Sequence, residues 1–249
     1  MSETPPGPEE NLAEGTLISH LVELRNRLFK IFGSVIAILL VLFPFSRKIF
    51  DFVAQPLVKF VPSGELQSLG PVAPLTATIS LTFYLALFLA MPVILYQVWA
   101  FVAPGLYKKE RRFAFPMLAS SILLFYAGMA FAYYVVFPLI FGFVSSFTPD
   151  IVEYKPDMAE YVSFVMMVIL VFGLAFETPI ATVLTVWTGL TTPEKLGKAR
   201  PYVFLGAFVV GMLLTPPDVI SQIVLAIPVY LLYELGIIMS KLIKTGPVK

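Results

Sequence analysis

Residues 161–188 read YVSFVMMVILVFGLAFETPIATVLTVWT, and this stretch decides the class of protein. Glu177 is the only charged residue within it. A helix needs about 20 predominantly apolar residues to cross the hydrocarbon core of a bilayer. The stretch meets this requirement, so we expect a membrane-spanning helix over roughly Tyr161–Thr188.

The same criterion finds five more candidate spans along the chain. They cover roughly Leu28–Phe45, Thr78–Phe101, Phe113–Ile140, Tyr202–Thr215 and Ile220–Ser240. The sequence therefore predicts an all-α integral membrane protein whose six transmembrane helices form a single domain, residues 17–244. Residues 1–16 are polar and rich in proline and are predicted to form a disordered tail, and residues 245–249 form a second tail.

The composition excludes several other classes of protein. The chain is 58% hydrophobic and 13% charged, whereas soluble proteins are about 45–50% apolar and about 25% charged. Its net charge of +1 excludes a basic nucleic-acid-binding domain. The chain has no cysteine and a single histidine, His20, which argues against thiolate, disulfide and histidine-based metal sites. We expect no cofactor and no bound metal.

The distribution of basic residues predicts the orientation in the membrane. Six spans place both termini on one side, and 13 of the 17 lysines and arginines lie on that side. Short cytoplasmic loops carry an excess of lysine and arginine. Both termini are therefore predicted to be cytoplasmic.

Two features distinguish the predicted spans from a plain helical bundle. Prolines inside spans favour kinks and a curved wall of helices, although membrane helices also tolerate them. The span Tyr202–Thr215 is short, at about 21 Å against a core of about 30 Å. Either the turn that follows lies inside the bilayer region or the bilayer thins there, and both cases would place Asp218 close to lipid depth. The span prolines are Pro44, Pro92, Pro116, Pro138, Pro179 and Pro228.

The segment before the first span separates apolar from charged residues. Glu23 and Arg27 are four residues apart, on the helix face opposite to a row of leucines. This pair is either a surface ion pair or a carboxylate displayed to a cationic ligand. Glu110 is the only acid among the four bases of Lys108–Arg112, so it is either incidental to a basic membrane anchor or a carboxylate that the bases keep ionised. The leucines are Leu17, Leu21, Leu24 and Leu28.

Glu177 is the strongest anomaly, because the one basic residue within the predicted spans, Lys30, lies at the cytoplasmic end of the first span and is not placed to neutralise it. It is expected near the middle of the membrane, either protonated and hydrogen-bonded or as a functional polar site. Gln222 needs a hydrogen bond within the protein or on a partner's helix. Glu234 lies near the end of its span and is predicted to be solvated.

Four motifs in order resemble the TatC family, the receptor subunit of the twin-arginine protein translocase. The resemblance covers the chain after the N-terminal tail. The motifs are HLVELRNRL (His20–Leu28), FVAPGLYKKERR (Phe101–Arg112), FGLAFETP (Phe172–Pro179), and TPPDVISQ (Thr215–Gln222) with LAIPVYLLYE (Leu225–Glu234).

This resemblance implies a glove-like arrangement of six helices in the cytoplasmic (inner) membrane of a bacterium or archaeon, and no enzymatic activity. The implied partners are folded cargo proteins with Arg-Arg signal peptides, the single-span subunits TatA and TatB, and further copies of the chain. Arginine suits a carboxylate site because its planar guanidinium forks onto two oxygens, which lysine cannot do.

The resemblance also implies roles for particular residues. Glu23 and Glu110, with Arg25 and Phe101, would read the signal peptide, and Glu177 would be the intramembrane carboxylate of the concave face. The partner-docking surface would comprise Met212, Thr215 and Gln222, and Pro56 and Asp218 match further positions of functional or structural importance. Lys109 departs from some members, which have histidine there.

Two other functions fit parts of the sequence. An ion-coupled small-molecule transporter would use Glu177 as a proton relay, but the chain shows no inverted repeat, and no second charge near the middle of a span completes a relay. An intramembrane hydrolase would need histidines or a pair of intramembrane aspartates, which the spans lack.

Overall fold

The computed structural model describes residues 8–59, 61, 63–102, 111–147, 149, 155–214 and 219–242. Within these residues every regular element is helical, and one isolated β-bridge joins Gln67 to Asp157. The predicted all-α class is therefore confirmed. The elements are α1 (Pro8–Leu42), the 3₁₀ turn η1 (Phe43–Phe45), α2 (Ser46–Val58), α3 (Ala73–Val102), α4 (Arg111–Phe131), the π-helical turn η3 (Ala132–Val136), α5 (Phe137–Phe147), α6 (Met158–Ala175), α7 (Thr178–Trp187), α8 (Pro193–Leu214) and α9 (Val219–Leu242).

Five helical segments of the described chain are long and apolar enough to cross a membrane. They are Ser19–Ala54, Ala73–Phe101, Phe115–Val144, Met158–Trp187 and Gln222–Leu242. The predicted span Tyr202–Thr215 lies largely in α8, which is not among these five segments of the described chain, so the count of six remains a prediction. The helix α1 begins at Pro8, within the region that the sequence assigned to a disordered tail.

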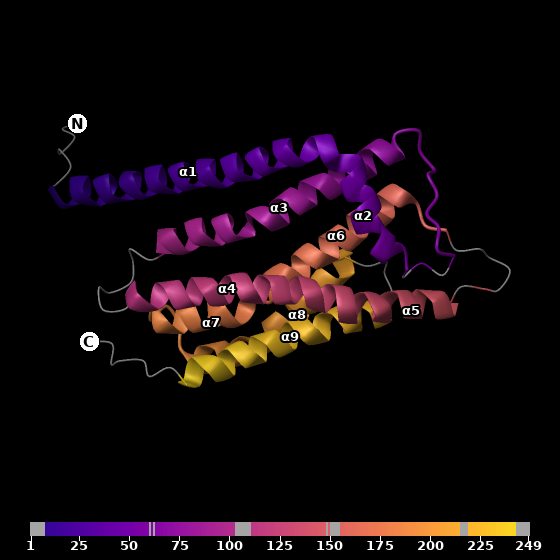
Figure 1. Ribbon diagram of the computed structural model, residues 1–249. Coiled ribbons are helices and arrows are strands. Elements are labelled where there is room, and N and C mark those ends of the chain that lie inside the picture. The colour runs from indigo at the N-terminus through magenta and orange to yellow at the C-terminus, as the bar shows by residue number, and fades with distance from the viewer. Residues whose placement is uncertain are drawn as a thin grey trace, which may run out of the picture.

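The helices fall into two groups joined by an oblique helix (Figure 1). The long helix α1 lies along α3, while α4, α7, α8 and α9 gather on the other side of the molecule. The helix α6 crosses between the groups and packs on both α3 and α4. The start of α1 and the end of α9 lie at the same end, which we call the terminal end. We call the opposite end, with Gln67 and Asp157, the distal end.

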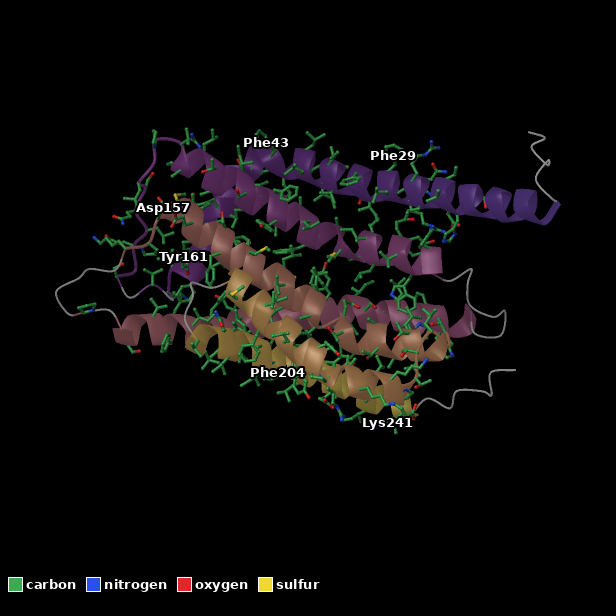
Figure 2. All side chains as sticks on the ribbon, turned by 180° about the vertical axis from the view of Figure 1, so that it is seen from behind. Phe29, Phe43, Asp157, Tyr161, Phe204 and Lys241 are labelled. Carbon is green, nitrogen blue, oxygen red and sulfur yellow. The ribbon has the colours of Figure 1, made fainter. Side chains whose placement is uncertain are left out.

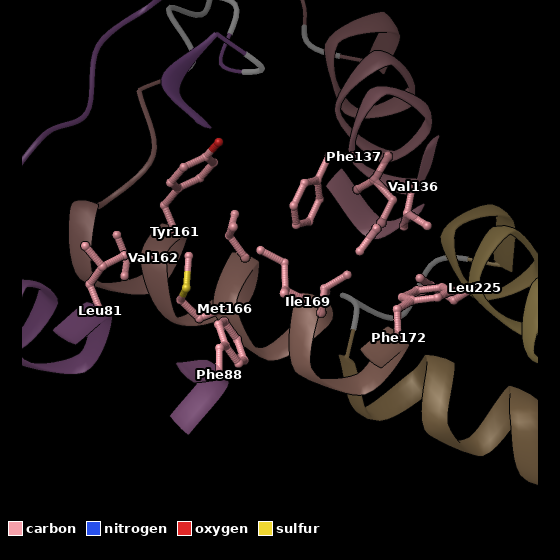
Figure 3. Packing of buried hydrophobic residues seen from close by; sticks show 14 of the residues in the cluster. Leu81, Phe88, Val136, Phe137, Tyr161, Val162, Met166, Ile169, Phe172 and Leu225 are labelled. Carbon is pink, nitrogen blue, oxygen red and sulfur yellow. The ribbon is translucent and has the colours of Figure 1, made fainter. Parts of the chain in front are cut away.

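The buried core lies where α6 meets α3, α4 and α5 (Figure 3). Phe125, Phe137 and Phe172 are completely buried there, together with Leu81. Many other large apolar side chains point outward, including Phe29, Phe43 and Phe204 (Figure 2). A soluble protein would not expose so many, whereas a lipid-facing surface requires them.

One proline inside a helix is compensated by a side chain from the next helix. Pro92 has no N–H, so it cannot donate to the carbonyl of Phe88 four residues earlier. The hydroxyl of Tyr126, from α4, donates to that carbonyl at 3.0 Å. The Phe88 carbonyl, which Pro92 leaves without a helical donor, therefore has a hydrogen-bond partner within the protein, as the lipid interior requires.

Two glycines allow α4 and α6 to cross at close range. A Cβ added at Gly173 would lie 2.6 Å from Cε2 of the Phe125 ring, and one at Gly128 would lie 2.9 Å from the backbone carbon of Phe172. Real Cβ atoms essentially never approach so closely. The crossing therefore depends on both glycines, at the position where the largest core rings interlock.

The distal end is held by one carboxylate that joins two loops. Asp157 caps α6 by accepting from the N–H groups of Ala159 and Glu160, and it accepts from the N–H of Leu69 at 2.9 Å. The hydrogen bond from the N–H of Leu69 makes the largest contribution to lowering the pKa of Asp157, and the bond from the N–H of Glu160 makes the next largest. Figure 2 shows Asp157 at the end opposite to Lys241.

We predict that Gly173→Ala destabilises the protein by about 1–3 kcal/mol, because the added methyl overpacks the α4–α6 crossing. Thermal unfolding in detergent measures the effect. Gly142→Ala is the matched control, since nothing lies within 4 Å of the Cβ that it adds and it also changes a helical glycine. Equal unfolding temperatures for the two variants would contradict the close crossing.

We predict that Asp157→Asn reduces the acid sensitivity of the protein. A carboxylate whose pKa is lowered by folding stabilises the native state above its unfolded pKa, and this stabilisation is lost as the pH falls through the folded pKa. The unfolding temperature of the wild-type chain should therefore approach that of Asp157→Asn as the pH is lowered from about 6 to about 3. A difference that stays constant over this range would contradict the prediction.

Candidate functional site

The segment around Glu23 turns its charged face toward the protein and its leucines away from it. Leu21, Leu24 and Leu28 are exposed, whereas Glu23 and Arg27 are partly buried. The predicted separation of the two faces is confirmed for these residues. In a soluble helix the apolar face would pack inward, but in a membrane protein the polar face seeks partners inside the protein.

The ion pair predicted from the four-residue spacing is present and extends to a second helix. Nε of Arg27 donates to Oε1 of Glu23 at 3.0 Å, and Nη2 donates to the same oxygen. Nη1 donates to Oε1 of Gln97 at 3.3 Å, and Nη2 also donates to the backbone carbonyl of Ala100 at 2.9 Å. The Ala100 carbonyl belongs to the last turn of α3, where helical carbonyls lack helical donors. Arg27 therefore ties α1 to the end of α3.

Phe101 and Arg25, two other predicted recognition residues, lie at the same end. Phe101 stacks on His20 of α1, with ring centroids 4.4 Å apart and planes 29° from parallel. His20 precedes Glu23 by one helical turn. Arg25 is exposed, and its guanidinium contacts Asn26 at 3.4 Å. Glu110 lies outside the described residues.

Glu177 lies in a break between two helices that form one membrane span. The helix α6 ends at Ala175 and α7 begins at Thr178, with Pro179 in its first turn. Oε1 of Glu177 is buried and has no hydrogen-bond partner among the described residues. The break is consistent with the sequence, since Pro179 cannot donate to the carbonyl of Ala175.

Two further polar side chains gather beside Glu177, and we call Trp99, Ser121 and Glu177 the Glu177 cluster. The buried Ser121 of α4 lies beside the Glu177 carboxyl and interacts with it. Nε1 of Trp99, on α3, donates to Oγ of Ser121 at 3.0 Å. The cluster therefore connects three separate parts of the chain inside the membrane region.

The Glu177 cluster lies closer to the terminal end of its span than to the distal end, and its depth in the membrane stays a prediction. Glu177 precedes the end of α7 by ten residues, about 15 Å of helix, and follows the start of α6 by 19. Trp99 is only three residues from the end of α3. An intramembrane carboxylate thus lies on the same side of the molecule as Glu23.

The predicted partner-docking residues are brought together in part. The helices α8 and α9 approach closely at Gly211, where an added Cβ would lie 3.3 Å from the backbone oxygen of Gln222. Met212, next to Gly211, is 52% exposed. Thr215 and Asp218 lie outside the described residues. The backbone of Pro56 lies in α2, far along the chain from this hairpin.

Glu234 lies near the end of its span and is partly exposed, as the sequence predicted, but it is also paired. It accepts from Nε of Arg200 at 2.6 Å and from Nη2 at 2.8 Å, and from the hydroxyl of Tyr230 at 2.8 Å. Arg200 is 34 residues away in the chain, so only the antiparallel packing of α8 and α9 reveals the pair. Among the described residues, no three His, Asp or Glu side chains come together in a way that could hold a metal ion.

Comparisons with known proteins bear on the function of these residues. Residues 19–228 match the model of the family described as Sec-independent protein translocase protein (TatC). The TatC proteins of Escherichia coli (strain K12) and Haemophilus influenzae are 55% and 47% identical over 226 residues, which is 90% of this chain and 88% of each relative. A crystal structure titled twin arginine translocase receptor TatC matches with a TM-score of 0.82 and 39% identity, over 90% of this chain and 98% of that one.

We predict that Ser121→Ala destabilises the protein by about 1–2 kcal/mol, because it leaves the Trp99 N–H without an acceptor in the membrane. Ser120→Ala is the matched control, since Ser120 is exposed and its hydroxyl donates only to the carbonyl of Pro116 in its own helix. Thermal unfolding in detergent compares the two. Equal losses of stability would show that the Trp99–Ser121 contact contributes nothing.

Proposed function

Because the chain belongs to the TatC family of Sec-independent protein translocase proteins, we propose that it binds Arg-Arg signal peptides of folded cargo at its terminal end. It is a multi-pass component of the Tat translocase, of the receptor type, and it is not an enzyme. Membership of this family favours the receptor over the small-molecule transporter that Glu177 alone would have allowed.

The observation that carries the proposal is the placement of Glu23. Arg27, which is itself bonded to the end of α3, fixes the carboxylate of Glu23, yet the Glu23 side chain remains 36% exposed. A carboxylate that is both fixed and accessible suits a cationic ligand. Phe101 and His20 stack close by and offer an apolar surface to the residues next to the arginines. Glu110 follows the end of α3 by eight residues in the sequence, and we propose that it supplies a second carboxylate.

The energetics fit a reversible receptor. At an effective dielectric constant of about 20, a guanidinium and a carboxylate 4 Å apart gain about 4 kcal/mol before desolvation. Salt screens exposed charges of this kind, so binding should weaken as the ionic strength rises. Arginine is preferred over lysine because its fork engages a carboxylate with parallel hydrogen bonds.

The α8–α9 hairpin supports a second role in assembly. Met212 is exposed beside the close approach of Gly211 to Gln222, and Thr215 continues the same region of the chain. We assign this surface to the single-span TatA-type and TatB-type subunits, and we expect further copies of the chain in the receptor complex. The localisation that goes with these roles is the bacterial inner membrane, with both termini in the cytoplasm.

We predict that the purified protein binds an Arg-Arg signal peptide more tightly than the same peptide with two lysines, and that Glu23→Gln removes the preference. The loss should reach about tenfold or more in the Kd for the Arg-Arg peptide, since the carboxylate supplies the charge that the guanidinium pairs with. Fluorescence anisotropy of labelled peptides at low and moderate salt measures both constants.

The control is Glu65→Gln, which removes one acid at the distal end and changes the net charge equally. Glu65 is exposed and pairs with Lys155 at 2.9 Å, far from the proposed site. Equal effects of the two variants would reduce Glu23 to a contributor to overall charge and would contradict the proposed site.

A further inference from the structure

We propose that Arg27 is a positioning residue for the recognition carboxylate: it holds Glu23 by one oxygen and leaves the other as the acceptor for the ligand's guanidinium. This inference rests on the proposed function and deepens it. An arginine inside an arginine receptor could either position the acid or compete with the ligand for it, and its bonding pattern decides between these two roles.

The guanidinium of Arg27 is held by more than Glu23. Its acceptors are Oε1 of Glu23 on α1, Oε1 of Gln97 on α3 and the backbone carbonyl of Ala100 on α3. Gln97 and Ala100 are 70 and 73 residues away in the chain. Gln97 is buried, and the Arg27 side chain is only 19% exposed. Arg27 is therefore anchored to α3 independently of the acid.

The bonding to Glu23 is one-sided. Both hydrogen bonds that Arg27 donates to the carboxylate go to Oε1. Within the described part of the chain, no hydrogen bond to Oε2 is found, while the Glu23 side chain remains 36% exposed. A competitor that mimicked the ligand would occupy both oxygens in a parallel fork. The observed arrangement instead orients the carboxylate and leaves one acceptor oxygen available.

Only arginine can make this connection. Its planar group carries five N–H donors in fixed directions, which here reach three acceptors on two helices. A lysine at this position would keep the charge but would place its three donors on a single nitrogen. Arg27→Lys therefore separates the two roles, since it retains the positive charge and removes the fixed geometry.

The test is the affinity of the full-length, detergent-purified protein for Arg-Arg and Lys-Lys signal peptides. Fixing a flexible side chain in advance typically changes affinity by about 2- to 12-fold. We expect Arg27→Lys to weaken Arg-Arg binding by about 3- to 10-fold, with a smaller effect on Lys-Lys binding. Gln97→Ala, which changes no charge and removes one anchor of Arg27, should weaken Arg-Arg binding in the same direction but less.

Two controls separate positioning from charge and from stability. Lys30→Gln removes one exposed positive charge from the same helix and should change Arg-Arg affinity less than twofold. In the Glu23→Gln background, Arg27→Lys should cause no further loss, because there is no longer a carboxylate to orient. A purely structural role of Arg27 would instead lower the unfolding temperature and weaken binding regardless of the residue at position 23.

The outcomes distinguish the possible failures. Arg-Arg binding that is unchanged or tighter in Arg27→Lys would overturn the positioning role and identify Arg27 as a bystander or a competitor. If Arg27→Lys does not fold, Gln97→Ala provides the test instead, and unchanged affinity of Gln97→Ala for the Arg-Arg peptide would overturn the proposal. If Glu23→Gln itself binds the Arg-Arg peptide like the wild type, the proposed function fails, and the role of Arg27 fails with it.

Discussion

A bilayer offers no water to polar groups, so each polar group in the interior must find its partner within the protein. This constraint accounts for the contacts that join the helices here. Arg27 joins α1 to α3, Trp99 joins α3 to α4 through Ser121, and the Tyr126 hydroxyl joins α4 to a proline position of α3. The apolar side chains of the outer surface face lipid and do not select which helices pack against each other. The polar contacts therefore determine how these helices are paired.

The same constraint explains where functional residues are found. A carboxylate that has no internal partner is costly in the membrane and persists only where something else uses it. Glu177 approaches this case, because its Oε1 has no hydrogen-bond partner among the described residues, while the break between α6 and α7 places its carboxyl beside Ser121. Glu23 differs, because it lies at the terminal end and is paired by Arg27 while remaining accessible. The two acids lie toward one end of the molecule, which suits a ligand that begins at the surface and continues into the membrane region.

Five of the six predicted spans correspond to long apolar helices, because a run of about 20 apolar residues is a local property of the sequence. The Glu23–Arg27 pair was predictable for the same reason, since it depends only on helical spacing. Its partners Gln97 and Ala100 were not, because residues 70 and 73 positions away meet only in the folded chain. The partner of Glu234 was missed for the same reason, because Arg200 belongs to another helix. The direction of the leucine face required the knowledge that a polar face turns inward in lipid.

The recognition function came from motifs more than from geometry. Glu23, Phe101 and Glu177 stand in strings that resemble one family, and the family match over residues 19–228 confirms that resemblance. No physical argument from single residues would have separated a receptor from a transporter with an intramembrane acid. The structure adds what motifs lack, namely that Glu23 is fixed by Arg27 and that Phe101 stacks on His20 beside it.

The most direct measurement is photo-crosslinking of an Arg-Arg signal peptide with the reactive group next to the arginines, followed by mapping of the adducts in membranes. The account predicts adducts in α1 around Glu23 and in the last turn of α3, residues 97–101. Adducts concentrated at the distal end, around residues 63–70 and 155–157, would contradict it, because the recognition carboxylate would then lie at the wrong end of the molecule.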